Sequence, residues 1–518
     1  MKKLLNIVIA SAAMLPLVSC SDSFLELDPV TAITTETFYK TATHFEQAMT
    51  AAYVRTRNIA LSGIFMDEMR SDNAFYTLYS GNRGEYTTTE VLALFLDDET
   101  VSWVPDRYNG VYAGIARVNA ILDRLDSSEL TEAEKSAYRA EALFLRAYYY
   151  FDLVQHWGGV PLMLHEVRND VDAFAAKSSK EEVYAQIIAD VSEAIKLGLP
   201  MPTKFPQSGR ATMGAAKMLR AYVYMSQPNR DYKAAEQDLL DITKMGYKLL
   251  DDYASVFSPS NKNSQESIFE VQYIEDGSTN QYCDFPWRLI PKCSNNQVLM
   301  GIGGANYAFT SGGWCVPTEE MIASYEPGDK RLDASVAVAV GTEDASQQFT
   351  CSGVKTVSEY QPVEGESAHF FVRKYYHPPY KYSLRAGENF PVYRYAGALL
   401  LLAENLVAQN RASEALPYVN QVRQRAGLPA LASVNEKAVA DEMRHELAFE
   451  NHRWTDLIRT GKAIETMSAF GQTMKAKYGW ILPAAFNVTE NRLVYAFPLR
   501  EMQINNLLEQ NPGYGTGR

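Results

Sequence analysis

Apolar residues recur every three to four positions through much of this 518-residue chain. That spacing places them on one face of an α-helix, and such a face must be buried against another element. Because several of these segments follow one another with short breaks, the sequence predicts a mostly α-helical protein. The segments with this spacing are 41–61, 108–125, 131–156, 180–197, 212–227 and 232–245.

Helical hairpins are the predicted building unit. The segments 214–227 and 232–245 flank the tight break Pro-Asn-Arg-Asp at 228–231, and the pair resembles a tetratricopeptide repeat unit. The segments 393–409 and 412–426 predict a second hairpin of this kind. The spacing between the units is irregular, so we expect degenerate repeats and not a regular array.

A long segment between the hairpins differs in character. Residues 258–390 are rich in Gly, Asn, Ser, Thr and aromatic side chains, with short strand-like runs such as 267–273. Helical spacing then returns, ends near Glu465, and reappears briefly around 500–508. We therefore predict a tetratricopeptide-like helical scaffold with a loop-rich insertion that carries short strands. The predicted parts are a signal peptide (1–19), an N-terminal helical region (20–257), the insertion (258–390) and a C-terminal helical region (391–518).

The start of the chain has the features of a secretory signal. Two lysines precede the mostly apolar run 4–18, and the small residue Ser19 precedes Cys20. The run is shorter than the roughly 20 apolar residues of a membrane span, and residues 17–20 resemble a bacterial lipobox. We therefore expect Cys20 to be lipidated and to anchor the chain, with 21–22 resembling a surface-export signal. The alternative is an ordinary signal that is cleaved near a cysteine.

Charge and cysteine spacing exclude several classes of function. A formal charge of −13 disfavours nucleic-acid binding, which relies on a basic surface. The four further cysteines contain no CxxC pair, so we predict no metal site and no cofactor. Two disulfide bridges and four buried thiols are both compatible with the sequence. These cysteines are Cys283, Cys293, Cys315 and Cys351.

Five separated motifs occur in one order along the chain. They are LRAYYYFDLVQHWGGVP at 145–161, YEPGDKR at 325–331, VNQVRQRAGL at 419–428, ELAFENHRWTDLIRTG at 446–461 and QNPGY at 510–514. Together with the lipobox, they resemble the SusD/RagB family of outer-membrane nutrient-binding lipoproteins. The resemblance extends from Cys20 to the C-terminus. Two residues depart from the family pattern: Met443 stands where the family usually has Arg, and Asn451 where it usually has Gly. Because Asn tolerates a left-handed backbone better than most residues, we expect Asn451 to keep the backbone geometry of the glycine.

The resemblance implies both a fold and a function. It implies a mostly helical protein with tetratricopeptide-like pairs, lipid-anchored in the outer membrane through Cys20 and facing the medium. Such proteins capture glycans and pass them to a TonB-dependent transporter barrel of the SusC type, without being enzymes themselves. The sequence leaves two alternatives open. One is peptide as the transported cargo, and the other is a helical-repeat adaptor that binds only protein.

Two catalytic interpretations fail on the residues themselves. Glu446 and Glu450 share a helical face, but an arginine within helical reach should keep both ionised, whereas a glycosidase needs one protonated acid. We therefore predict an internal salt-bridge network over 442–459. His445-Glu446 begins a zinc-protease motif, but Phe449 replaces the second ligand. Asp329 is expected to pair with Arg331, not to bind calcium.

Loops on a rigid scaffold are where binding residues concentrate, so we predict the ligand site there. Sugar rings pack on exposed aromatic faces, and their hydroxyls need polar neighbours. By resemblance, the family's binding surfaces draw on the insertion and on the loop 72–86, although each aromatic could instead pack its own loop against the scaffold. The candidates are Tyr282, Trp287, Arg288, Asn296, Tyr307 and Trp314 in the insertion, and Asn73, Tyr76, Tyr79, Arg83 and Trp103 in or after the loop.

Overall fold

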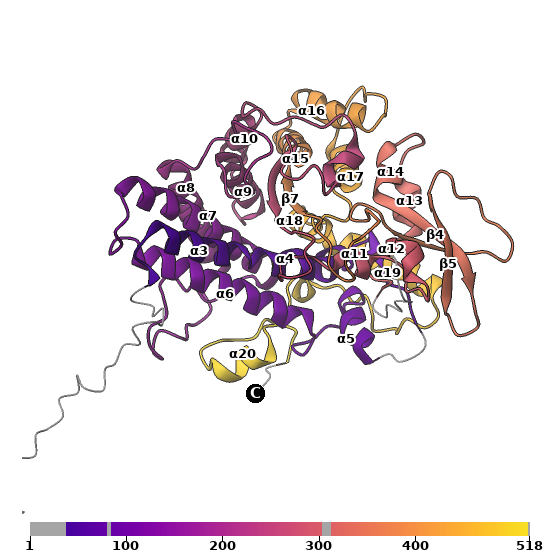
Figure 1. The fold of residues 1–518 in the computed structure, drawn as a ribbon, viewed down its shortest axis with the longest axis horizontal. Coiled ribbons are helices and arrows are strands. Elements are labelled where there is room, and N and C mark those ends of the chain that lie inside the picture. Colours follow the sequence, from indigo (N-terminus) through magenta and orange to yellow (C-terminus); the bar gives the residue numbers. More distant parts are fainter. Residues whose placement is uncertain (1–37, 80–83, 303–311, 516–518) are drawn as a thin grey trace, which may run out of the picture.

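A computed structural model describes residues 38–79, 84–302 and 312–515 (Figure 1). The predicted signal peptide and the predicted lipidation site Cys20 lie outside these residues. Within the described part of the chain, no helix is both long enough and apolar enough to cross a membrane.

The first predicted helix is divided in the structure. The segment expected as one helix over 41–61 forms α3 (Ala42–Tyr53) and α4 (Thr56–Gly63), followed by the π-helical turn η2 (Ile64–Glu68). At the joint, the Thr56 hydroxyl donates to the carbonyl of Tyr53 at 2.7 Å. The Thr56 side chain thus binds a carbonyl oxygen that would accept a backbone N–H in a continuous helix. The prediction of a single helix is therefore wrong here.

The other long helices confirm their predictions to within a few residues. Two begin with a capping box, in which Thr131 and Glu134, or Ser179 and Glu182, satisfy each other's backbone N–H groups. The capping residues therefore define the helix starts locally, which explains the agreement. The helices are α6 (Trp103–Arg124), α7 (Glu132–Trp157), α8 (Lys180–Leu197), α9 (Met213–Ser226) and α10 (Tyr232–Ile242).

Neighbouring hairpins stack into one continuous layer (Figure 1). The helix α7 packs on α8, α8 on α9, and α9 on α10. The layer continues from α10 to the second predicted hairpin, α15 (Tyr395–Ala408) and α16 (Ala412–Arg425), although the insertion separates them in sequence. The protein is therefore mostly α-helical with a hairpin scaffold, as predicted.

The C-terminal region contains more helix than predicted. The helices α17 (Glu436–Glu446), α18 (Arg453–Arg459) and α20 (Leu499–Ile504) fall in or near the expected regions. The prediction that the pattern ends near Glu465 is wrong, because α19 (Ala463–Lys477) extends past it. Its buried stripe consists of Ala, Met and Gly side chains, a weaker hydrophobic signal than branched apolar residues.

The segment 258–390 contains short strands that pair in three small sheets. Strand β2 (Ser267–Val271) pairs with β7 (Phe390–Arg394), and β1 (Ala74–Phe75) pairs with β3 (Val316–Pro317), both antiparallel. The third sheet has the order β5-β4-β6 and lies at one end of the molecule (Figure 1). Its strands are β4 (Val336–Glu343), β5 (Phe349–Thr356) and β6 (Ser367–Val372).

Short helices lie between these longer elements in the described parts of the chain. They are α5 (Gly84–Ala93), η3 (Tyr253–Phe257), α11 (Phe285–Leu289), α12 (Asn296–Met300), α13 (Glu319–Ser324), α14 (Lys330–Ser335) and η4 (Glu490–Arg492). The division of the chain at 257 and 390 stays a prediction.

The predicted salt-bridge network exists, but its partners come from distant elements. Glu446 forms ion pairs with Arg331, Arg394 and Arg425, all buried. These arginines outweigh the effect of burial and hold the pKa of Glu446 below its usual value. Asp329 pairs with Arg331 at 2.7 Å, as predicted.

Two further predictions concern Glu450 and Asn451, which follow α17 in the chain. Glu450 pairs with Lys374 and Arg394 at 2.7 Å, so helical neighbours do not supply its cations. Arg453, the expected helical neighbour, instead binds Asp72. Asn451 has φ +62°, the left-handed geometry expected where the family usually has glycine.

Candidate functional site

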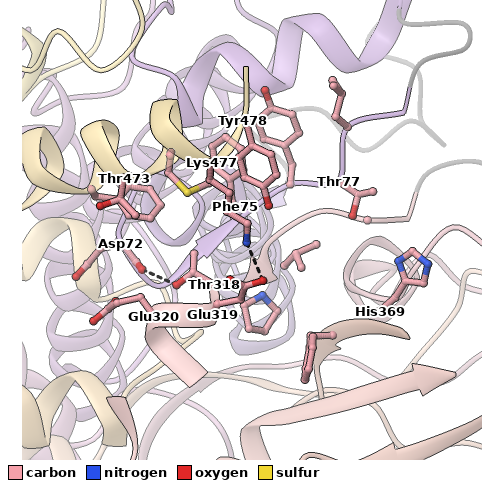
Figure 2. A pocket seen from close by; sticks show the side chains of 18 of the residues that line it. Asp72, Phe75, Thr77, Thr318, Glu319, Glu320, His369, Thr473, Lys477 and Tyr478 are labelled. Carbon is pink, nitrogen blue, oxygen red and sulfur yellow. Dashed lines mark hydrogen bonds and ion pairs between the residues drawn. The ribbon is translucent and has the colours of Figure 1, made fainter. Parts of the chain in front are cut away.

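Four segments that are distant in sequence supply most of the lining of a cavity of about 910 Å³. They are the loop 72–78 around β1, the segment 316–320 at β3 and the start of α13, residues 368–370 of β6, and the segment 466–480 from α19 onward. Figure 2 shows side chains from these segments facing one another across the cavity. Ligand pockets in proteins fall in this range of volume, and this one is mainly apolar with a few polar groups.

Aromatic rings from two segments form one wall of the cavity. Phe75 stacks on Tyr76 with ring centroids 4.3 Å apart, and on Trp480 at 6.2 Å. Tyr478 contacts Trp480 at 5.5 Å. Phe75 and Tyr76 are buried, whereas the Trp480 side chain is 36% exposed. The inner rings therefore support Trp480, which can offer an indole face to a ligand.

The positions of these rings depend on local packing. The pairing of Phe75 with Val316 fixes the loop 72–78 against β3, and the Thr318 hydroxyl donates to the carbonyl of Asp72 at 3.1 Å. On the other side, Gly471 lets α19 approach Phe486, because a Cβ at Gly471 would lie 2.3 Å from the Phe486 Cβ. The aromatic wall thus rests on a strand pair and on a close helix–loop contact.

Charged groups at the cavity are paired. The carboxylate of Asp72 contacts Arg453 at 2.8 Å and Arg444 at 3.0 Å. Burial alone would raise the pKa of Asp72, but the two guanidinium groups outweigh it and lower that pKa below its usual value. Lys477 and Glu319 form an ion pair at 2.8 Å, which Figure 2 shows within the cavity. Asp72 is therefore a fixed negative charge and cannot act as a proton donor at neutral pH.

Of the predicted tryptophans, Trp287 and Trp314 lie in the core and Trp103 packs against it, partly buried. Trp287 is 2% exposed and packs on Tyr380, and Trp314 is 6% exposed with its ring edge-on to Phe65. Trp103 stacks on the same Phe65 with ring centroids 4.2 Å apart, and its indole N–H donates to the hydroxyl of Thr89. The expected exposure of Trp287 and Trp314 is thus not found, because their own loops bury them against the scaffold.

The other candidates of the insertion make intramolecular contacts. Tyr282 is half-buried beside Arg385, and Arg288 pairs with Asp284. Asn296 is buried, and neither polar atom of its carboxamide has a hydrogen-bond partner in the structure. These residues do not line the cavity.

The candidates of the loop 72–86 are closer to the cavity. Tyr76 lines it directly, as part of the aromatic wall. Asn73 is buried and donates to Glu68, and Tyr79 is buried and accepts the N–H of Lys292. The structure thus brings one described candidate, Tyr76, to the cavity. Arg83 and Tyr307 lie outside the described residues.

Sequence reasoning missed Phe75, Tyr478 and Trp480. The available signal was the run Tyr478-Gly-Trp480 directly after a helix, the same combination of aromatics and glycine that was weighed in the insertion. This run belongs to the C-terminal region, outside the two regions that the family resemblance indicates for ligand binding. The elements α19 and β6, which complete the cavity, have no local sequence feature that relates them to the loop 72–78.

The four described cysteines are free and buried. Burial raises the pKa of the thiols of Cys283 and Cys315 well above their usual value, so both are protonated and poorly reactive at neutral pH. Of the two states left open by the sequence, the structure contains the buried thiols.

Comparisons with known proteins agree with this architecture. The family model described as "SusD family" matches residues 265–514, and one described as "Starch-binding associating with outer membrane" matches residues 23–225. The chain belongs to the SusD family. The two matched ranges include the segments that enclose the cavity and most of the helical scaffold, although α10 lies between them.

Relatives of this SusD-family protein match along most of their length. SusD-like protein P2 of Formosa agariphila is 27% identical over 97% of this chain and 98% of its own. Starch-binding protein SusD of Bacteroides thetaiotaomicron is 23% identical over 84% of this chain and 85% of its own. The solved structure of a laminarin binding SusD-like protein is similar with a TM-score of 0.74 and 26% identity, covering 92% of this chain and all of that one.

Proposed function

We propose that this protein captures an oligosaccharide or polysaccharide in the cavity beside Trp480 and delivers it to a TonB-dependent transporter of the SusC type. The observation that carries the proposal is the exposed indole of Trp480, backed by Phe75 and Tyr478 at the edge of a large cavity. A sugar ring presents C–H groups to such a face, while threonine hydroxyls and carboxylates nearby can bond its hydroxyl groups. Relatives described as starch-binding and laminarin binding support a glycan as the ligand.

Binding without catalysis is part of the proposal. Glycoside hydrolysis requires one carboxyl group that is protonated at working pH. Two guanidinium groups hold Asp72 ionised, and Glu319 is engaged by Lys477. Glu446 and Glu450 are buried in the ion-pair network, away from the cavity lining.

The cellular location belongs to the same proposal. The lipobox-like residues before Cys20 support a lipid anchor, and the family description associates such proteins with the outer membrane. An anchor at the N-terminus leaves the folded body free to face the medium, where polymeric nutrients are present. Copurification of the tagged protein from outer membranes with a transporter barrel tests the partner, and mass spectrometry of the mature N-terminus tests the lipid on Cys20.

The decisive binding experiment uses Trp480→Ala. We expect isothermal titration of the purified protein against a polysaccharide panel to find a glycan ligand, and the variant to bind it about tenfold more weakly or worse. The loss reflects the aromatic contact together with the apolar area that the indole covers.

An exposed aromatic side chain outside the cavity supplies the matched control. Phe174 is 43% exposed and does not line the cavity, so Phe174→Ala should bind like the unmodified protein. Unchanged binding by a folded Trp480→Ala variant would contradict the proposed site.

A further inference from the structure

The charged groups at the cavity are engaged with one another. Among the described residues that line it, the carboxylates are Asp72, Glu319 and Glu320, while the cationic groups are Lys477 and, when protonated, His369. The glutamates are the more accessible groups: the side chains of Glu319 and Glu320 are 78% and 58% exposed, against 38% for Lys477. Arg444 and Arg453, which pair with Asp72 and Glu320, bring the cations level with the carboxylates, so a ligand meets ion pairs whose more exposed members are the glutamates.

The cations at the cavity are engaged by carboxylates. Lys477 contacts Glu319 at 2.8 Å, and the His369 ring contacts Glu343 at 2.8 Å. An ammonium ion beside a carboxylate offers an incoming anion little net attraction, because the neighbouring charge cancels much of its field.

The nearby guanidinium groups are engaged as well. Arg444 contacts Glu320 at 2.6 Å and Asp72 at 3.0 Å, and Arg453 contacts the same aspartate. Proteins recognise sulfate and carboxylate groups mainly through the planar fork of arginine, and here both forks already bind carboxylates. An anionic sugar substituent would have to displace one of these contacts.

Neutral polar groups complete the lining. Thr77, Thr466 and Thr473 supply hydroxyl groups that can both donate and accept hydrogen bonds, which suits sugar hydroxyls. The whole chain also has a formal charge of −13, so a polyanion is repelled at longer range as well.

We infer that the cavity selects uncharged polysaccharides over sulfated or carboxylated ones. This inference rests on the proposed glycan capture and narrows its ligand to one chemical class. Selection arises because carboxylates already occupy Lys477, His369 and the two nearby arginines, with the aromatic wall providing affinity for either kind of sugar ring.

Matched polymers test this selection. Laminarin and amylopectin, their chemically sulfated derivatives, and alginate are titrated calorimetrically against the full-length protein and its Trp480→Ala variant. We expect a neutral polymer to bind, its sulfated derivative to bind at least tenfold more weakly, and alginate not to bind. The affinity for the neutral polymer should also stay constant between about 0.05 and 0.5 M salt, because no ligand charge is screened.

Glu319→Gln provides a second measurement, since it releases the ammonium group of Lys477 at an exposed site. The ratio of affinities for the sulfated and neutral polymers should rise about two- to fivefold. The charge selection would be overturned if the sulfated polymer bound as tightly as its neutral parent and this binding were lost in Trp480→Ala. Glycan capture would still stand in that case. Absence of binding to every polymer would overturn glycan capture and the selection together.

Discussion

Trp287 and Trp480 illustrate how exposure, at the scale of single residues, separates structural from ligand-contacting aromatics. Both are tryptophans in segments with glycine or proline nearby, and the sequence favoured Trp287. The structure places Trp287 in the core against Tyr380 and leaves part of Trp480 open at the cavity. Residue type and local composition are thus the same in both cases, and only tertiary packing distinguishes them.

Trp287→Ala tests this difference. Removing a fully buried indole should lower the free energy of unfolding by about 3–5 kcal/mol, as truncations of large core side chains do. Urea unfolding followed by circular dichroism measures the loss, and the folded fraction should still bind the glycan. A stable variant that no longer binds would instead restore Trp287 as a ligand contact.

At the scale of elements, helices could be predicted far better than the cavity. Helical spacing and capping boxes such as Thr131–Glu134 are local patterns, so the sequence alone indicates where α7 lies. The cavity instead depends on strand pairing between Phe75 and Val316 and on the approach of α19 to that loop. These contacts join residues that are hundreds of positions apart, for which one sequence contains no local signal.

Gly471 is the position where α19 depends most on a missing side chain. Its Cβ position lies 2.3 Å from the Phe486 Cβ, so Gly471→Ala should displace α19 or Phe486 and lower stability by about 1–3 kcal/mol. Because Phe470 and Lys477 on the same helix line the cavity, glycan affinity should fall too.

Gly479 provides the matched control for that substitution. A Cβ at Gly479 meets no heavy atom within 4 Å, and the residue lies between the two aromatic residues Tyr478 and Trp480. Thermal unfolding and titration should therefore leave Gly479→Ala close to the unmodified protein. Equal effects of the two substitutions would show that steric contact at α19 is not the cause.

At the scale of the whole molecule, buried charges join distant parts of the chain. Glu446 holds arginines from α14, β7 and α16 together, and Glu68 accepts N–H groups from Phe449 and Asn451. The two glutamates differ in electrostatics, since three guanidinium groups lower the pKa of Glu446. Burial raises the pKa of Glu68 to about 7 despite its hydrogen bonds.

Glu68 predicts a specific pH dependence of stability. Its folded pKa of about 7 lies above the usual 4.5, so the folded state retains a proton that the unfolded state releases. This contribution is complete below about pH 4.5 and is lost as the pH rises through about 7. Relative to Glu68→Gln, the unmodified protein should lose about 3 kcal/mol of unfolding free energy over that range.

Denaturant unfolding of both proteins at several pH values measures the difference. Other titrating groups, such as His445, contribute equally to both proteins and cancel. A stability difference that does not change between pH 4.5 and 7.5 would contradict the raised pKa of Glu68.

The most direct test of the central claim is a crystal structure of the protein with a bound oligosaccharide. Glycan capture at this site predicts density for a sugar ring packed on the indole of Trp480, within the cavity lined by the loop 72–78, β6 and α19. The proposed site would be contradicted by a sugar bound elsewhere, for example beside Tyr282 in the insertion, while the cavity stays unchanged and empty at saturating ligand.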